Sequence, residues 1–325
     1  MASQFTIYRS GDVSAPALSG TAGSLLALLD ACLVTGYGTK LPPSPAWTKP
    51  FANAGNIGCY TPGAGAMQSL VVNDNGPGVG TFKEARLSGF ETLTSVSTGN
   101  RVFPTAAQGI GFVVGRKSAS ADAVARQWIV CADSSTAYVF VLTGDTASTY
   151  YAFMFGDIYA AGGSADAYRT MLIGRTVENS AVGSSESLDA ITTSAAGQNT
   201  GKFLSRSWSG SIISLPIAMT TVGDNPKSNS ATALLGTVLM PNPMDNAIYL
   251  SPLWVAEGTF STAAVGYIRG RLRGFYHFCH AVASVQDGQE FNGSGDYAGK
   301  SFLILKSSGN GGVYCLETSA TVDTN

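Results

Sequence analysis

Charged residues are scarce in this sequence. Only 12% of its 325 residues are Asp, Glu, Lys or Arg, against about 25% in ordinary globular domains. The formal net charge is −2, so no excess of one sign favours nucleic acid or an anionic membrane surface. Disorder is not indicated, because 45% of the residues are hydrophobic. The composition indicates a β-rich chain whose surface is polar but uncharged and is partly covered by neighbouring molecules.

Long hydrophobic runs are also missing. No uninterrupted apolar segment reaches the roughly 18 residues of a membrane-spanning helix. Residues 1–12 lack the basic end and the apolar run of a secretory signal. We therefore expect a protein that is made in the cytoplasm and has no membrane partner.

Histidines are few, and the cysteines do not occur in the closely spaced pairs that are typical of metal or redox sites. The sequence has two histidines, His277 and His280, and five scattered cysteines without a CxxC pair. A serine triad or a zinc site has few candidate residues, and free thiols are expected rather than disulfides. Cys279 lies between the histidines, but on a strand His280 would point away from the other two side chains. We expect an aromatic strand here and no metal site.

Neither the glycine clusters nor the acidic residues form a recognisable site. The clusters at 76–80 and 109–111 lack the strand–turn–helix context of phosphate or dinucleotide sites, so no cofactor is expected. A glycosidase needs two facing carboxylates. The spacing of the central acids places no two of them face to face: Asp157, Asp166, Glu178, Glu186 and Asp189. The sequence predicts no enzyme, with a polysaccharide depolymerase that uses Asp157 or Asp166 as an alternative.

The densest aromatic and β-branched segment lies at 128–159. Turn residues divide it into three expected strands: Trp128–Cys131, Ala137–Leu142 and Tyr150–Phe155. Both faces of the middle strand are apolar, because Tyr138 and Phe140 alternate with Val139 and Val141. Such a strand should be covered on both sides, as at the centre of a sandwich.

One helix is expected near the N-terminus, over about 22–35. Five apolar residues recur at helical spacing: Leu25, Leu28, Leu29, Cys32 and Leu33. Thr21 or Ser24 is the expected N-cap. A helix of about three turns is marginal alone, so its leucine face should pack on the β core or on another subunit. The four leucines are candidate assembly contacts.

Most of the remaining chain consists of short segments bounded by turns. The further expected strands are Ser69–Asn73, Lys83–Phe90, Gly109–Gly115, Ala167–Arg175, Phe203–Trp208, Ser211–Met219, Ala233–Met240, Ile248–Val255 and Ala264–Phe278, with a closing hairpin of Phe302–Lys306 and Gly312–Leu316. The pattern predicts a mainly β fold, an antiparallel β-sandwich or barrel-like core with one short N-terminal helix and long loops. A Ser-, Thr- and Ala-rich stretch at 177–201 suggests two β-rich regions, 1–200 and 201–325, with one continuous domain as the alternative.

One charged feature has a defined geometry. Arg269, Arg271 and Arg273 would share a face of a strand, between Tyr267 and Phe275. Such a stripe suits phosphate or an acidic protein surface. The near-neutral net charge favours a solvated or intersubunit face with carboxylate partners over nucleic acid. The three arginines are therefore also candidate assembly contacts.

Several packing and turn motifs occur in order along the chain. They are V-T-G-Y-G and W-T-K-P-F within Ser24–Phe51, K-E-A-R, G-F-E and F-P-T within Lys83–Thr105, F-G-D-I-Y and D-A-Y-R-T-M-L-I-G-R within 128–175, and R-G-R-L-R-G-F and A-G-K-S-F-L-I-L within Arg269–Leu305. Together these stretches resemble an uncharacterised family of virion structural proteins from tailed bacteriophages. The resemblance covers most of the chain, although 177–230 contributes little, and it implies no catalytic residue and no cofactor.

The resemblance implies a virion component in the tail, neck or baseplate, with capsid decoration as the next alternative. Its partners would be other virion proteins and copies of itself in a homo-oligomer. An alternative of another class is a β-sandwich module that binds a host glycan or receptor. In that case Trp47, Trp208 or Trp254 must be exposed, because a tryptophan in the core cannot stack on a sugar.

Overall fold

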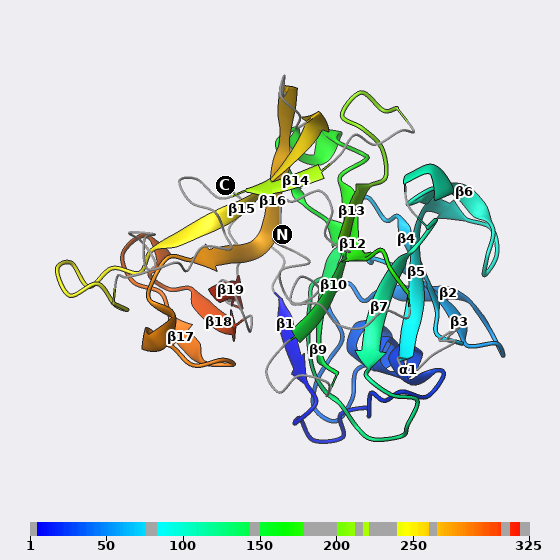
Figure 1. The fold of residues 1–325 in the computed structure, drawn as a ribbon, viewed down its shortest axis with the longest axis horizontal. Helices are drawn as coiled ribbons and strands as arrows, with labels where there is room; N and C mark the ends of the chain where they lie inside the picture. The colour runs from blue at the N-terminus through cyan, green and yellow to red at the C-terminus, as the bar shows by residue number, and fades with distance from the viewer. Residues whose placement is uncertain are drawn as a thin grey trace.

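Antiparallel β-sheet dominates the computed structural model of the chain. It describes residues 5–75, 83–108, 110–143, 150–178, 200–211, 217–220, 239–259, 265–306 and 313–318. Within these ranges the strands form two curled sheets, accompanied by a single short α-helix (Figure 1). This confirms the predicted mainly β, sandwich-like or barrel-like fold.

The first sheet has twelve strands in the described part of the chain. Its spatial order is β1 (Thr6–Arg9), β8 (Gln127–Ala132), β9 (Thr136–Leu142), β10 (Tyr150–Asp157), β12 (Thr170–Arg175), β7 (Val113–Ser118), β5 (Lys83–Leu93), β4 (Ser69–Asn73), β3 (Ile57–Thr61) and β2 (Thr48–Asn53), with β13 (Thr200–Leu204) paired to β12 and β6 (Gly99–Phe103) paired to β5. The three strands expected at 128–159 are β8, β9 and β10, which pair consecutively as a meander.

The second sheet has seven strands among the described residues. Its spatial order is β14 (Ile217–Thr220), β15 (Leu250–Thr259), β16 (Val265–Phe278), β19 (Val313–Glu317), β18 (Ser301–Lys306) and β17 (Glu290–Asn292), with β11 (Tyr159–Ala160) paired to β16. Strands β18 and β19 pair antiparallel, as predicted for the closing hairpin. Because β11 directly follows β10 in the chain, the two sheets are joined at residue 158.

The first sheet curls around the helix. The helix consists of α1 (Ser24–Leu29) and a π-helical continuation, η1 (Asp30–Thr35). Side chains from strands along most of the sheet meet the helix in one buried cluster: Tyr8, Val130, Val139, Phe155, Leu172, Val113, Leu87, Val72 and Tyr60. The predicted leucine face is therefore the centre of the chain's own core.

The four leucines proposed as assembly contacts are consequently not available to another subunit. Leu25, Leu28, Leu29 and Leu33 are each at most 1% exposed within the single chain. The helical periodicity correctly identified a face that must be buried. The part of the interpretation that assigned this face to a neighbouring molecule was wrong, because the curled sheet covers it completely.

The start of the helix is anchored by a distant ion pair rather than by a local cap. Gly23 is the N-cap residue, in a left-handed conformation with φ 81°. The Leu25 amide donates to Oδ2 of Asp74 at 2.8 Å, and Asp74 forms a buried salt bridge with Lys117. The predicted cap at Thr21 or Ser24 is wrong, because the Ser24 hydroxyl donates back to carbonyl oxygens, including that of Ser19 at 2.8 Å.

The outer face of the meander packs on the second sheet. In β9, Val139 and Val141 lie in the helix-facing cluster, whereas Tyr138 and Phe140 lie in the cluster between the sheets. This confirms the prediction that the strand is covered on both faces. The ring of Phe275 on β16 stacks on that of Tyr138, with 5.5 Å between their centroids. Such aromatic pairs contribute about 0.5–1.5 kcal/mol beyond the burial of their area.

Some predictions fall on residues that the structure does not describe. The predicted joint at 177–201 lies mostly outside the described ranges, as does the predicted strand Ala233–Met240. The division into 1–200 and 201–325 stays a prediction. All five cysteines are buried free thiols, as expected. In the ranges described, no helix combines the length and the apolar character that crossing a membrane requires.

Candidate functional site

The arginine stripe lies on β16, but its three members have different surroundings. Arg269 is only 4% exposed. Its Nη1 donates to Oε2 of Glu257 at 2.5 Å, and its Nη2 donates to Oδ2 of Asp166 at 2.8 Å. Glu257 is fully buried on the adjacent strand β15. The carboxylate partners that we expected are therefore supplied by the same chain, and little of the Arg269 side chain is left for contact with another molecule.

Arg273 links the two sheets. Its Nη2 donates to Oδ2 of Asp133 at 2.5 Å, in the turn between β8 and β9. The other carboxylate oxygen of Asp133 accepts hydrogen bonds from the amides of Ser135 and Thr136, at 2.7 and 2.8 Å. Arg273 is thus held against a buried acid of the first sheet. Arg273 is partly exposed where it lines a cavity, so its assignment as an assembly contact stays a prediction.

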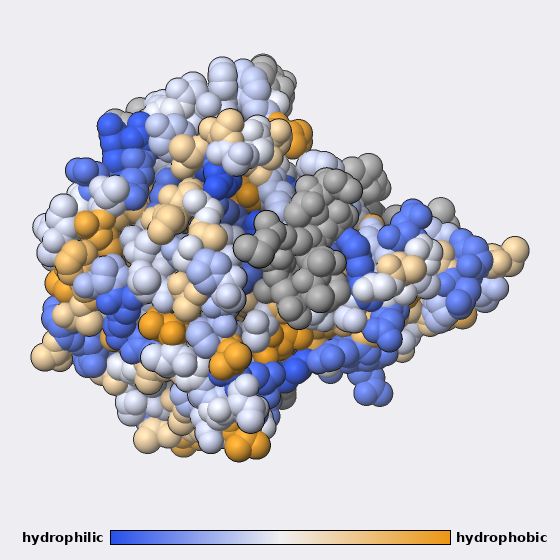
Figure 2. All heavy atoms as spheres, turned by 180° about the vertical axis from the view of Figure 1, so that it is seen from behind, coloured by the Kyte–Doolittle hydropathy of each residue, from blue (hydrophilic) through white to orange (hydrophobic). Residues whose placement is uncertain are grey.

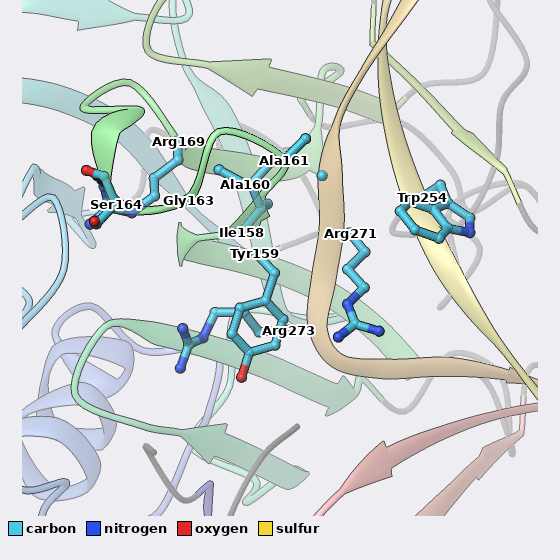
Figure 3. Close-up of a pocket in the computed structure, with 11 residues that line it drawn as sticks. Ile158, Tyr159, Ala160, Ala161, Gly163, Ser164, Arg169, Trp254, Arg271 and Arg273 are labelled. Carbon is cyan, nitrogen blue, oxygen red and sulfur yellow. Dashed lines mark hydrogen bonds between the residues drawn. The ribbon is translucent and has the colours of Figure 1, made fainter. Parts of the chain in front are cut away.

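Arg271 is the member that faces an open cavity. Its side chain is half-buried and lies in a cross-strand row, directly opposite Tyr159 of β11 on one side and Trp254 of β15 on the other. Residues directly opposite each other on antiparallel strands share a face of the sheet. Figure 3 shows the Arg271 side chain between the Tyr159 and Trp254 rings. Together these side chains form a wall of a cavity of about 640 Å³.

Tyr159 orients two guanidinium groups. The Cζ atom of Arg273 lies 4.5 Å from the centroid of the Tyr159 ring, and that of Arg271 lies 5.5 Å from it. Cation–π contacts of this kind contribute about 0.5–2 kcal/mol, depending on solvent exposure. Burial raises the pKa of the Tyr159 hydroxyl to about 12, so the side chain is an uncharged phenol at neutral pH.

Arg169 forms the opposite side of the cavity and is bound to Asp157. Its Nε donates to Oδ2 of Asp157 at 2.8 Å, and its Nη1 donates to the carbonyl oxygen of Asp166 at 2.8 Å. Burial raises the pKa of Asp157, and Arg169 opposes that shift. Of the three arginines that line the cavity, Arg169 and Arg273 are thus neutralised by acids. Arg271 makes no ion pair with any residue that the structure describes.

The acids considered for a depolymerase are also held in ion pairs with arginines. Asp157 is bound by Arg169, and Asp166 is bound by Arg269. Glu178 pairs with Arg86 at 2.6 Å on the first sheet. Glu186 and Asp189 lie outside the described residues. Each acid of this group that the structure describes is therefore paired with an arginine of the same chain.

The histidine segment has a structural role at the end of β16. His280 accepts a hydrogen bond at Nε2 from the Tyr249 amide, at 2.7 Å, while its Nδ1 lies 2.9 Å from the Leu239 carbonyl oxygen. An imidazole that accepts at one nitrogen and donates at the other is neutral. His277 instead approaches Cys279, with Nδ1 3.9 Å from Sγ. Within the described ranges, no three His, Cys, Asp or Glu residues are grouped so as to hold a metal ion.

The three tryptophans considered for sugar stacking have different exposures. Trp47 is buried, and its Nε1 donates to the Asp133 carbonyl oxygen at 2.8 Å. Trp254 is half-buried in the cavity wall. Trp208 is 56% exposed, and its ring lies 5.0 Å, centroid to centroid, from that of Tyr267. Only Trp208 therefore presents most of its ring to a surface ligand.

Sequence reasoning singled out Arg271 and considered Trp254 for sugar stacking, but it did not place Trp254 or Tyr159 beside Arg271. Trp254 and Tyr159 lie 17 and 112 residues before Arg271 in the chain. The pairing of β15 and β11 with β16 brings them together. Alignment of Ile248–Val255 against Ala264–Phe278 as one hairpin is the signal that could have placed Trp254 beside Arg271. In comparisons with known proteins, no protein-family model and no curated sequence matches this chain.

Proposed function

We propose that this chain is a structural component of a tailed-bacteriophage virion, in the tail, neck or baseplate, that acts through protein–protein contacts. The resemblance of its packing motifs to virion proteins supports the proposal. The observation that carries it is an exposed aromatic patch formed by Tyr267 of β16 and Trp208, which lies in the turn after β13. Its partners are other virion proteins and copies of the same chain.

The patch has the composition and rigidity of a contact site. Trp208 and Tyr267 are 56% and 43% exposed. Tryptophan and tyrosine are enriched among the residues that contribute most to binding energy at protein interfaces. The Trp208 amide donates to Oε2 of Glu257 at 3.0 Å, and Arg269 holds the same carboxylate. The patch is therefore supported from beneath by a buried ion pair, so little ordering of its backbone is needed on binding.

Small contact sites also suit the face of the molecule that is shown in Figure 2. Seen from behind, hydrophobic residues form separate small patches among hydrophilic ones (Figure 2). An obligate subunit interface is usually larger and more hydrophobic. We therefore expect attachment through local patches such as that around Trp208. Capsid decoration would use the same type of contact, and the location of the protein in the particle distinguishes the two.

The double substitution Trp208→Ala with Tyr267→Ala is expected to reduce incorporation into particles at least tenfold. A tenfold change in affinity corresponds to about 1.4 kcal/mol, which is within the range for loss of interface aromatics. Incorporation is measured by quantitative mass spectrometry of purified phage particles after complementation with each variant. Immunogold labelling locates the wild-type protein on the tail or the capsid.

Met244→Ala is the matched control, because Met244 is 90% exposed and lies on a different loop. This variant should be incorporated like the wild type. The proposal is wrong if the protein is missing from purified particles. The role of the patch is wrong if the double variant is incorporated normally.

The exposure of Trp208 also favours a second function, the binding of a host glycan. An exposed aromatic ring can stack on the apolar face of a sugar, and the adjacent Tyr267 ring extends that surface. We expect at least one neutral or acidic glycan on an array to bind, and Trp208→Ala to weaken that binding at least tenfold. Leu239→Ala, at a residue that is 60% exposed, is the control. Binding that persists in Trp208→Ala would exclude the patch as the glycan site.

A further inference from the structure

We propose that the cavity lined by Tyr159 of β11, Arg271 of β16 and Trp254 of β15 binds a small ligand that carries one carboxylate on a sugar ring, such as a uronic acid unit. Arg271 would bind the carboxylate. A ligand here needs neither a place in a particle nor the patch around Trp208. The inference therefore goes beyond both functions proposed above.

The charge balance of the cavity favours a single negative charge. Its three lining arginines are Arg169, Arg271 and Arg273. Asp157 and Asp133 neutralise the first and the last of them. The uncharged Tyr159 phenol adds no negative charge to the wall. One uncompensated guanidinium, that of Arg271, therefore remains to bind an anion.

Arg271 is held in position for binding. It lies between Tyr159 and Trp254 in one cross-strand row, and its guanidinium packs near the face of the Tyr159 ring. A guanidinium presents a planar fork of donors that matches the two oxygens of a carboxylate. Because the neighbouring rings already restrict the side chain, less conformational entropy is lost when the ligand binds.

The remaining walls suit a hydroxylated ring. The cavity volume of about 640 Å³ lies within the range typical of small-molecule sites, about 300–1,000 Å³. The rim on the side of β11 carries small residues, Ala160, Ala161 and Gly163, and the exposed Ser164. Serine and backbone groups can hydrogen-bond to sugar hydroxyls, while the Trp254 ring offers an apolar surface. A sugar acid supplies the matching carboxylate, hydroxyls and C–H face.

The test is calorimetric titration of the full chain with sodium glucuronate, glucose, sodium acetate and inorganic phosphate. We expect glucuronate to bind at least tenfold more tightly than each of the other three. Arg271→Gln should weaken glucuronate binding at least tenfold. Arg101→Gln should not change it, because Arg101 is an exposed arginine on β6 without an ion pair in the described structure. Circular dichroism melting of each variant checks that it is folded.

Four results would overturn the inference. Equal affinity for glucose and glucuronate would mean that the carboxylate is not recognised. Equal affinity for acetate and glucuronate would mean that the sugar ring is not recognised. Tighter binding of phosphate would indicate a phosphate site, and unchanged binding by a folded Arg271→Gln variant would place the ligand elsewhere. None of these results depends on whether the protein is found in particles, so failure here is distinct from failure of the proposed function.

Discussion

Replacement of Arg269 by methionine is expected to lower the free energy of unfolding by about 3–5 kcal/mol. Removal of one partner from a buried ion pair has this effect, because the remaining charge is left without compensation in a poorly solvated site. The charge left behind is that of Glu257, which is fully buried and receives the Arg269 guanidinium at 2.5 Å. The measurement is urea denaturation followed by circular dichroism, with the slope of the transition checked for two-state behaviour.

Arg271→Met is the matched control, two residues further along the same strand. Arg271 is half-buried and has no ion pair with any described residue, so its replacement should change the free energy of unfolding by less than about 1 kcal/mol. Addition of Glu257→Gln to Arg269→Met should restore part of the loss, because the uncompensated charge is removed. Equal small losses for Arg269→Met and Arg271→Met would contradict the structure and support a solvated stripe.

Replacement of Leu28 by alanine is expected to cost about 2–5 kcal/mol, the range for loss of a buried leucine side chain and the cavity it leaves. Leu28 is fully buried within the curled sheet. The oligomeric state should not change, because the side chain touches only its own chain. Denaturation gives the stability, and light scattering after size-exclusion chromatography gives the oligomeric state.

Leu41→Ala is the control for this substitution. Leu41 is 76% exposed, so its truncation should change the stability by less than about 0.5 kcal/mol. A Leu28→Ala variant that dissociates into smaller oligomers without loss of stability would show that the leucine face is a subunit contact after all.

Local periodicity predicted the strands that are buried on one or both faces. The alternation in 137–142 and 83–90 identified β9 and β5, and the leucine spacing identified the helix. It failed for β2 and β3, where no strand was expected from the sequence. β2 lies at the edge of the first sheet and contains Pro50, and none of its six residues is buried. An edge strand without a buried face has little alternation to detect.

The surroundings of the three arginines could not be predicted from local sequence patterns, because they depend on contacts between distant segments. Period-2 spacing placed Arg269, Arg271 and Arg273 on one face, as if β16 were regular. The pairing of β15 with β16 shifts register between Val255 and Ala256, so that Arg269 is an extra residue in the ladder. A bulge of this kind redirects the side chain. The acids that bind Arg269 and Arg273 come from positions 12 to 140 residues away in the chain.

The contacts that anchor the N-terminal end of α1 also come from residues far away in the chain. Asp74 and Lys117 lie 49 and 92 residues beyond Leu25. An N-cap search considers only the residues next to the helix, so it selected Thr21 and Ser24. The observed partner, Asp74, follows β4 and reaches the helix only when the sheet has curled around it.

Enclosure of the helix also constrains the order in which the new chain can fold on the ribosome. Residues 24–35 precede every strand of the first sheet except β1. The last residue of β13, the final described strand of this sheet along the chain, is added about 170 residues after the end of the helix, which at about 5–20 residues per second is roughly 8–34 s of synthesis. During that time the leucine face has no finished sheet to cover it. An isolated helix of this length is marginal in water, so the segment that becomes the centre of the core must wait for the strands that give it a stable structure.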